Sequence, residues 1–184
     1  MKLFISVKNN KITLSRIMSE ELIKLLEGKT DKDRMKTLIN KDDKIFKFFV
    51  QHCCKNELTS WRAAWVLHHA IKKNDNRIKP HLKKIILSIK EKKDGHQREL
   101  LKIVQKMELT EKEEGYFFDS CVNLWEEVHK KPATRYYAGL FIIKMAGKYP
   151  EIKNELEALT SEYYTKTLSS GIRRIFDREL LKIN

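Results

Sequence analysis

Four arginines recur along this chain at nearly constant intervals. They lie 36, 37 and 38 residues apart, at Arg62, Arg98, Arg135 and Arg173. Apolar residues recur with nearly the same period in two series, which are Leu67, Ile103 and Leu140, and Leu82, Phe118 and Leu156. A repeat of this length, with two helices in each unit, is typical of a stack of helix pairs, an α-solenoid. The period therefore predicts an all-α chain in which each unit packs mainly on its neighbours.

One predicted helix, over residues 60–71, is apolar on nearly every side. Its polar residues form a single stripe through Arg62, His69 and Lys73. A helix that is apolar almost all round must be buried between neighbours. We therefore expect this helix to be central in the molecule, with Trp61 and Trp65 in its core.

The other helices are predicted from apolar residues at helical spacing and from the capping, Gly and Pro residues between them. They cover residues 19–27, 30–39, 42–55, 80–93, 97–107, 110–125, 132–146, 150–159 and 172–183. Thr110 and Glu113 form a capping-box pattern at the start of one helix, and Gly95 is expected to end another. No stretch alternates at period two for long enough to predict a strand. About ten helices are expected, after an irregular lead over residues 1–18.

The composition is that of a single domain with a strongly solvated exterior. A chain of 184 residues is long enough to bury a core without disulfides or metals, so residues 1–184 are predicted to form one domain. The N-terminal apolar run is short and interrupted by lysines, and no run approaches the length of a membrane span. We expect a cytoplasmic protein whose three cysteines are mainly structural, although a redox or metal role stays open.

The sequence Arg62-Ala63-Ala64-Trp65-Val66-Leu67, followed by a helix that Pro80 begins, resembles HEAT repeats. The resemblance extends over about residues 42–183 and includes a group of small bacterial HEAT-like proteins. It implies a right-handed α-solenoid of antiparallel helix pairs, with first helices on the convex side and second helices on the concave side. It also implies a protein-binding role. The last unit, from Arg173 onward, departs from the pattern and is expected to cap the stack.

Basic residues are concentrated between residues 72 and 106, within a chain whose formal net charge is +13. A basic strip of this kind is an electrostatic footprint for phosphates. The candidate anion or nucleic-acid surface consists of Arg77, Lys79, Lys83, Lys84, Lys90, Lys93, Lys102 and Lys106. The alternative is that these side chains only solvate exposed helix faces.

Catalytic and metal sites are predicted only weakly. His68 and His69 cannot both bind one metal without another helix, because adjacent helical residues point about 100° apart. His52 facing His68 across a helix pair is conceivable as a metal site, but no metal ligand or cofactor is predicted. Glu126 and Glu127 beside Trp125 resemble, at fold level only, the acidic and aromatic residues of HEAT-like DNA alkylation-repair glycosylases. No phosphate loop, nucleophile elbow or Cys/His nucleophile pair is present, so no catalytic residue is assigned.

These observations favour a non-enzymatic binding module or scaffold with an unidentified protein partner. The alternative is a nucleic-acid-binding protein that uses the basic strip as a concave surface, with or without base-repair activity. The expected repeat positions are Trp61, Arg62, Trp65, Leu67, Leu82, Arg98, Ile103, Phe118, Arg135, Leu140 and Leu156.

Overall fold

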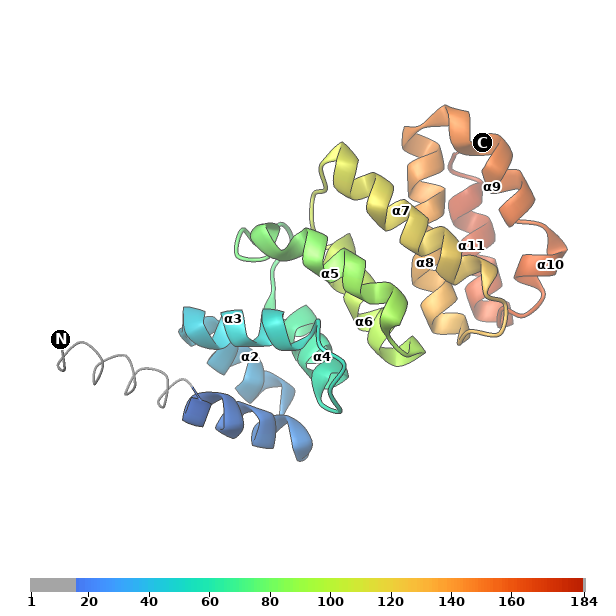
Figure 1. Cartoon of the computed structure of the whole chain (residues 1–184). Coiled ribbons are helices and arrows are strands. Elements are labelled where there is room, and N and C mark those ends of the chain that lie inside the picture. Colours follow the sequence, from blue (N-terminus) through green and yellow to red (C-terminus); the bar gives the residue numbers. More distant parts are fainter. Residues whose placement is uncertain (1–15, 184) are drawn as a thin grey trace.

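The computed structural model describes residues 16–183, and every regular element in that part is a helix (Figure 1). A helical segment over residues 16–27 comes first. The longer helices that follow are α2 (Lys32–Lys41), α3 (Asp43–His52), α4 (Ser60–Ala70), α5 (Leu82–Ser88), α6 (Asp94–Gln105), α7 (Glu111–Glu126), α8 (Pro132–Lys148), α9 (Lys153–Leu159) and α11 (Ser170–Leu180). Short elements are the 3-10 helices η1 (Lys79–His81), η2 (Ile89–Glu91) and η3 (Pro150–Ile152), and α10 (Glu162–Thr165).

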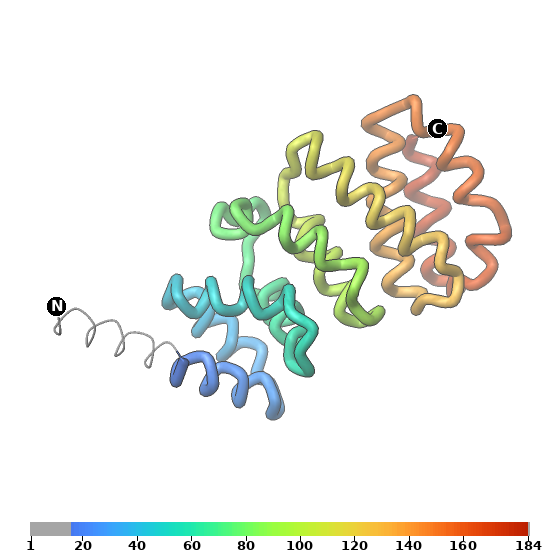
Figure 2. The backbone as a smooth tube through the Cα atoms, in the orientation of Figure 1, coloured from blue at the N-terminus to red at the C-terminus, as the bar shows by residue number. Residues whose placement is uncertain are grey.

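The helices stack one after another, so that the described chain progresses from one end of the molecule to the other (Figure 2). A first layer contains α2, α4, α6, α8 and α11, each in contact with the next member of the layer. In the other layer only α5 and α7 are in comparably extensive contact. The first layer therefore has contacts between successive helices along its whole length. Which of the two layers lies on the concave side stays a prediction from the HEAT resemblance.

Several boundaries differ from the sequence-based prediction. The helix predicted over residues 80–93 is divided into η1, α5 and η2, and Gly95 lies in the first turn of α6 instead of ending the preceding helix. Glycine is destabilising mainly in the middle of a helix, because of its conformational freedom, and Gly95 lies at the start of α6. The lead is also shorter than expected, since helix is already present at residue 16, and residues 1–15 of it lie outside the described part.

The helix starts are of two kinds. Side chains cap α2, α3, α7 and α11, and the Thr110–Glu113 capping box is confirmed. In contrast, α4, α6 and α8 begin without a side-chain cap. Thr59 is positioned at the start of α4, but its hydroxyl pairs with His52 Nε2 at 2.8 Å and makes no cap hydrogen bond to the helix.

The core runs through both layers and contains most of the predicted repeat positions. Leu67, Leu82, Ile103 and Leu156 are buried, whereas Phe118 and Leu140 are half-buried. Trp65 is half-buried and packs against the core.

The repeat arginines differ in burial and in the contacts they make. Arg62 donates to the carbonyls of residues 26–28, and Arg135 is completely buried, whereas Arg98 is part-exposed and pairs with Glu99.

The prediction that Trp61 belongs to the core is wrong. The buried face of α4 is made by small and medium residues, Ala63, Ala64, Val66, Leu67 and Ala70. Trp61 lies one position outside that face in the first turn, and 46% of its surface is exposed. The first turn of this largely apolar helix therefore contains one large aromatic residue that its neighbours leave nearly half exposed.

Candidate functional site

Because consecutive helices run in opposite directions, four loops meet on one side of the stack. We call this side the loop edge and define it by residues 28–31, 53–59, 92–93 and 127–131; it follows the lower side of the stack in Figure 1. Hydrogen bonds link each of these loops, or the helix start that follows it, to the next one along the stack. Arg62 donates to the carbonyls of residues 27 and 28 at 2.7 and 3.3 Å, Lys92 Nζ donates to the Cys54 carbonyl at 2.9 Å, and Thr134 Oγ1 donates to the Asp94 carbonyl at 2.8 Å. The edge is thus a rigid, continuous surface.

A shallow groove crosses the loop edge between the first two clear repeat units. Its walls come from the α3–α4 loop with the start of α4, and from η2 with the start of α6. The lining residues are Asn56, Glu57, Leu58, Trp61, Glu91, Lys92, Lys93, Gly95 and His96. Leu58 is 94% exposed beside Trp61, so two large apolar side chains lie uncovered in one place. Such a cluster on an otherwise charged surface is typical of an interaction site.

The ends of this groove lead into smaller hollows. One, on the α2 side, is lined in part by Lys29, Arg62 and Trp65. The other, on the α8 side, is lined by Lys93, Asp94, Gly95, Lys130 and Lys131. The apolar centre of the loop edge therefore has basic residues on both flanks.

The predicted basic strip is divided by the structure. Lys79, Lys83, Lys84 and Lys90 are exposed on η1, α5 and η2, and Lys93 is exposed on the loop edge. The remaining three residues have partners within the protein. Arg77 pairs with Asp75 at 2.7 Å, Lys102 pairs with Glu99 at 3.0 Å, and Lys106 Nζ donates to the carbonyls of residues 68 and 71. These three come from the inner part of the fold and do not continue the α5 surface.

Arg77 is held particularly firmly. Its guanidinium lies 4.0 Å from the centre of the Phe46 ring and also donates to Asn40 Oδ1 at 2.8 Å. The neighbouring Arg77 guanidinium holds the pKa of the Asp75 carboxyl below its usual value. This arginine is a structural link between α2, α3 and the loop before η1.

The histidines and cysteines form no metal site among residues 16–183. His52 and His68 do not face one another across a site, because His52 pairs with Thr59 whereas His68 lies 3.8 Å from Glu99. His96 Nε2 bonds to the Cys53 carbonyl at 2.7 Å. Burial lowers the pKa of His68 to about 3 and that of His96 to about 4, so both rings are neutral near pH 7.

Two adjacent thiols, Cys53 and Cys54, follow α3 directly, and their pKa values are shifted in opposite directions. Cys53 Sγ and Cys54 Sγ are 3.9 Å apart, with Cys53 buried and Cys54 half-buried. The hydrogen bond from Cys53 lowers the pKa of Cys54 to about 7, and Lys84 and Lys92 act in the same direction. That hydrogen bond, with burial, raises the pKa of Cys53 well above its usual value.

The aromatic and acidic cluster considered for a glycosylase-like pocket is closed. Trp125 is 1% exposed, stacks on Phe176 with ring centres 4.7 Å apart, and donates from Nε1 to the Leu159 carbonyl. A base cannot stack on a ring that another ring already covers. Glu126 and Glu127 are exposed beside it without an accessible aromatic partner at Trp125.

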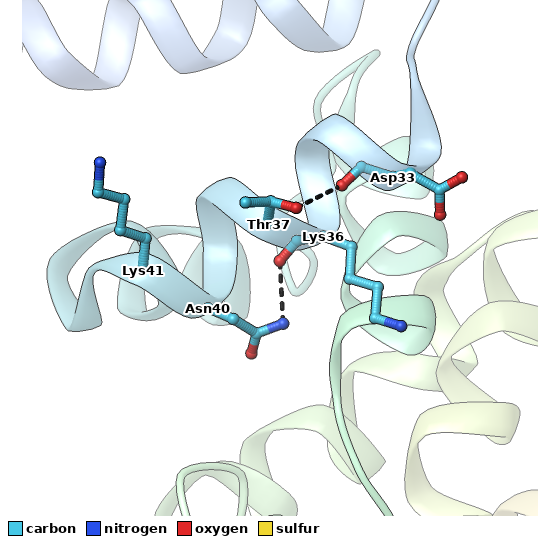
Figure 3. Close-up of a pocket in the computed structure, with 5 residues that line it drawn as sticks. All are labelled: Asp33, Lys36, Thr37, Asn40 and Lys41. Atoms are coloured by element: carbon cyan, nitrogen blue, oxygen red, sulfur yellow. Dashed lines mark hydrogen bonds between the residues drawn. The ribbon is translucent and has the colours of Figure 1, made fainter.

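A hollow on the outer face of α2 also lacks reactive geometry (Figure 3). Asp33, Lys36, Thr37, Asn40 and Lys41 all come from this one helix. Figure 3 shows that Thr37 and Asn40 donate to backbone carbonyls one turn earlier, at 3.0 and 2.9 Å. Asn40 also donates to the Ala70 carbonyl at 3.2 Å and accepts from Arg77, so Thr37 and Asn40 both make structural hydrogen bonds.

The sequence gives a weak sign of the loop edge. Leu58 is an isolated apolar residue in the otherwise polar segment from Lys55 to Thr59, which is a place where no buried residue is expected. The apolar pattern of residues 60–71 predicts that Trp61 is a core residue, and it gives no prediction for Leu58. Their proximity depends on the turn into α4, which periodicity does not specify.

Comparison with known proteins identifies the architecture. The model of the HEAT repeat domain matches residues 18–183, nearly the whole chain. No characterised protein and no solved structure gives a significant match. In the described part, no helix combines the length and apolar character that crossing a membrane requires. With its two-layered stack of helix pairs and this match, the chain belongs to the HEAT repeat family.

Proposed function

We propose that this protein is a non-enzymatic binding module whose partner is another protein, bound at the loop edge. The observation that carries the proposal is the exposed pair Leu58 and Trp61 beside a groove. Tryptophan is among the residues that contribute most to protein interfaces when they are covered. Helical-repeat stacks commonly bind partners along such extended surfaces.

Nucleic-acid binding is the second candidate, and exposed lysines on η1, α5 and η2 favour it. Lys79, Lys83 and Lys90 have no ion pair within residues 16–183, so their charges are available to phosphates. Lysine is a weaker phosphate clamp than arginine, because its ammonium group is a point charge without bidentate geometry. Arg77, the only arginine in the predicted strip, forms an ion pair with Asp75 and is therefore less available to a phosphate.

Two measurements on the full chain separate these candidates. The first is affinity capture from host lysate, with nuclease treatment, at 50 and 200 mM salt. A protein partner held by apolar contacts is retained under all of these conditions. The second is fluorescence anisotropy with labelled duplex DNA, single-stranded DNA and RNA.

Binding through about six or more phosphates would fall on the order of a thousandfold between 50 and 200 mM salt. It would also be lost in the triple variant Lys79→Glu, Lys83→Glu, Lys90→Glu. That result, together with no captured protein, contradicts the proposed function and supports the nucleic-acid alternative.

A further inference from the structure

We propose that the groove on the loop edge binds an extended acidic segment of a partner protein, anchored by an apolar side chain on Leu58 and Trp61. The inference rests on the proposed function and adds the site and the chemistry of the partner. It is independent of the lysines on α5, which lie in the other layer.

The apolar anchor comes from the shape and exposure of the groove centre. Leu58 is almost fully exposed, and the ring of Trp61 is held in place by Arg62, whose guanidinium lies 5.2 Å from the ring centre. Opposite them, Gly95 has open space around it, since an added Cβ would meet no atom within 4 Å. The groove centre therefore has room for one apolar side chain, and covering Leu58 and Trp61 would remove apolar surface from water.

The charge on both flanks selects the partner. Lys29, Lys93 and Lys131 line the hollows at the two ends, and their side chains form no ion pair within residues 16–183. The acids nearby are largely neutralised, because Glu57 pairs with Lys55 at 3.0 Å and Asp94 lies near Lys130.

Two acids are exceptions, since neither Glu91, which lines the groove, nor Asp31, which caps α2 on the loop edge, forms an ion pair in the described part. The flanks therefore keep more unpaired positive than negative charge. Carboxylates on either side of an apolar residue complement this pattern.

The extent of the surface favours an extended segment. The hollows lie at the ends of successive first helices, from the α2 side to the α8 side. Packed helices are roughly 8–10 Å apart, so the surface extends roughly 25–30 Å across three spacings. An extended chain covers roughly 3.3–3.6 Å per residue, which corresponds to about eight residues.

The surface is also preorganised. The two walls of the central groove are joined by Lys92, which donates to the Cys54 carbonyl, and by His96, which bonds to the Cys53 carbonyl. Both side chains are buried. A groove whose walls are already fixed loses little conformational freedom on binding.

The test uses the full chain and three fluorescein-labelled pools of ten-residue peptides, measured by fluorescence anisotropy. Each pool has Leu, Phe or Trp at its two central positions. The flanking positions are Asp, Glu or Ser in the acidic pool, Lys, Arg or Ser in the basic pool, and Asn, Gln or Ser in the neutral pool. We expect the acidic pool to bind at least about tenfold tighter than either of the others, because only it complements the lysines.

A steric variant locates the site without disturbing the core. Gly95→Trp projects into the open groove, and Gly171→Trp is the matched control, because Gly171 is also exposed, is also the second residue of a helix, and also has no atom within 4 Å of an added Cβ. We expect Gly95→Trp to weaken acidic-peptide binding at least about tenfold and Gly171→Trp to change it less than about twofold. Circular dichroism and thermal melting verify that both variants fold.

A charge variant tests the flanks. Lys93→Glu with Lys131→Glu reverses the unpaired charges beside the groove, and Lys44→Glu with Lys112→Glu makes the same change in net charge at the opposite edge, where α3 and α7 begin. We expect a loss of at least about tenfold for the first pair and less than about twofold for the second. Equal losses would show a general effect of net charge and overturn the assignment of the flanks.

The inference is overturned if the acidic pool binds no tighter than the other pools, or if Gly95→Trp leaves its binding unchanged. The proposed function fails separately, when lysate capture yields no protein and nucleic acid binds with the salt dependence and the loss in the triple lysine variant given above. If a captured protein is retained equally by Gly95→Trp, protein binding stands and this groove is excluded as its site.

Discussion

The molecule contains two tryptophans with an arginine over the ring, and they have opposite surroundings. In the C-terminal half, the Arg135 guanidinium lies 4.5 Å from the centre of the Trp125 ring, and both side chains are buried. On the loop edge, Arg62 and Trp61 form a similar pair with the ring 46% exposed. The two rings differ in what packs against them. Phe176 of α11 stacks on Trp125, whereas the outer side of Trp61 is left exposed. The same pair of residue types is structural in one repeat and available for binding in another.

The buried arginine shows how completely the C-terminal pair is used. Arg135 donates to the Trp125 carbonyl at 2.9 Å, to the Tyr164 carbonyl at 2.6 Å and to Thr167 Oγ1 at 2.6 Å. Arg62 donates only to the carbonyls of residues 26, 27 and 28, at the end of the first helical segment, and its ring partner Trp61 is 46% exposed. Whether a neighbouring helix packs on the tryptophan therefore determines whether the arginine–tryptophan pair is buried in the core or exposed.

Trp125→Ala against Trp61→Ala gives the largest expected contrast. Removing Trp125 leaves a cavity, breaks the stack with Phe176 and leaves the Leu159 carbonyl without its donor, so the free energy of unfolding should fall by about 3–5 kcal/mol. Trp61→Ala removes a half-exposed ring and should change stability by about 0.5 kcal/mol or less. Chemical denaturation of both variants checks this, and equal losses would contradict the comparison.

Acid should act on the α3–α6 region, because its histidines are buried in neutral form. Burial lowers the pKa of His96 to about 4 and that of His68 to about 3 in the folded protein, so the unfolded chain, whose histidines have a pKa of about 6.5, binds more protons below that pH. The contribution of each histidine to the free energy of unfolding is fully present above about pH 6.5. It should fall by about 2 kcal/mol for each histidine by pH 5. Denaturation at pH 7 and pH 5 measures the loss. His96→Gln, which keeps an amide donor for the Cys53 carbonyl, should reduce it, and an unchanged loss would exclude His96 as a cause.

Gly139→Ala tests the tightness of the C-terminal packing. An added Cβ would lie 2.6 Å from Phe176 and 2.7 Å from Trp125, so two rings would have to move. We expect a loss of about 1–3 kcal/mol. Gly115→Ala, on the exposed face of α7 with open space around it, should instead stabilise by about 0.5–1 kcal/mol. A neutral result at position 139 would mean that the rings are not held as tightly as the structure shows.

The thiols should show the smallest effect, a difference in labelling rate at nearly constant stability. Cys54 has a pKa of about 7, whereas burial raises the pKa of Cys121 well above its usual value. The thiolate is the reactive form, so iodoacetamide should label Cys54 first, at a rate that rises with pH to a plateau above about pH 8. Peptide mass spectrometry checks the order, and faster labelling of Cys121 would mean that the C-terminal half opens more readily than the groove region.

Much of the architecture could be predicted from the sequence. The arginine period predicted paired helices in a stack, and the start of α4 at residue 60 and the capping box at Thr110 were confirmed. These features depend on local chemistry and on residues that every unit repeats. Contacts between units are not local, which is why the exposure of Trp61 in the first turn of α4 could not be predicted.

The candidate site could be predicted much less well. The basic strip was predicted from the number of basic residues in one segment of the sequence. The structure shows that three of them, Arg77, Lys102 and Lys106, are already paired within the fold. Trp61 was assigned to the core because its helix is apolar, although its exposure depends on what packs beside the first turn. The groove itself depends on a loop and a helix start that are distant in sequence.

Site-specific photo-crosslinking in the host cell tests the central claim most directly. A benzophenone amino acid at position 58 places the probe on the loop edge, and the same amino acid at position 181, where the native Leu181 is 77% exposed, is the matched control. The account predicts a discrete crosslinked protein from position 58, absent from position 181 and lost when Gly95→Trp is added. Equal products from both positions, or a product at position 58 that Gly95→Trp does not reduce, would contradict the claim that the uncovered tryptophan marks a binding surface.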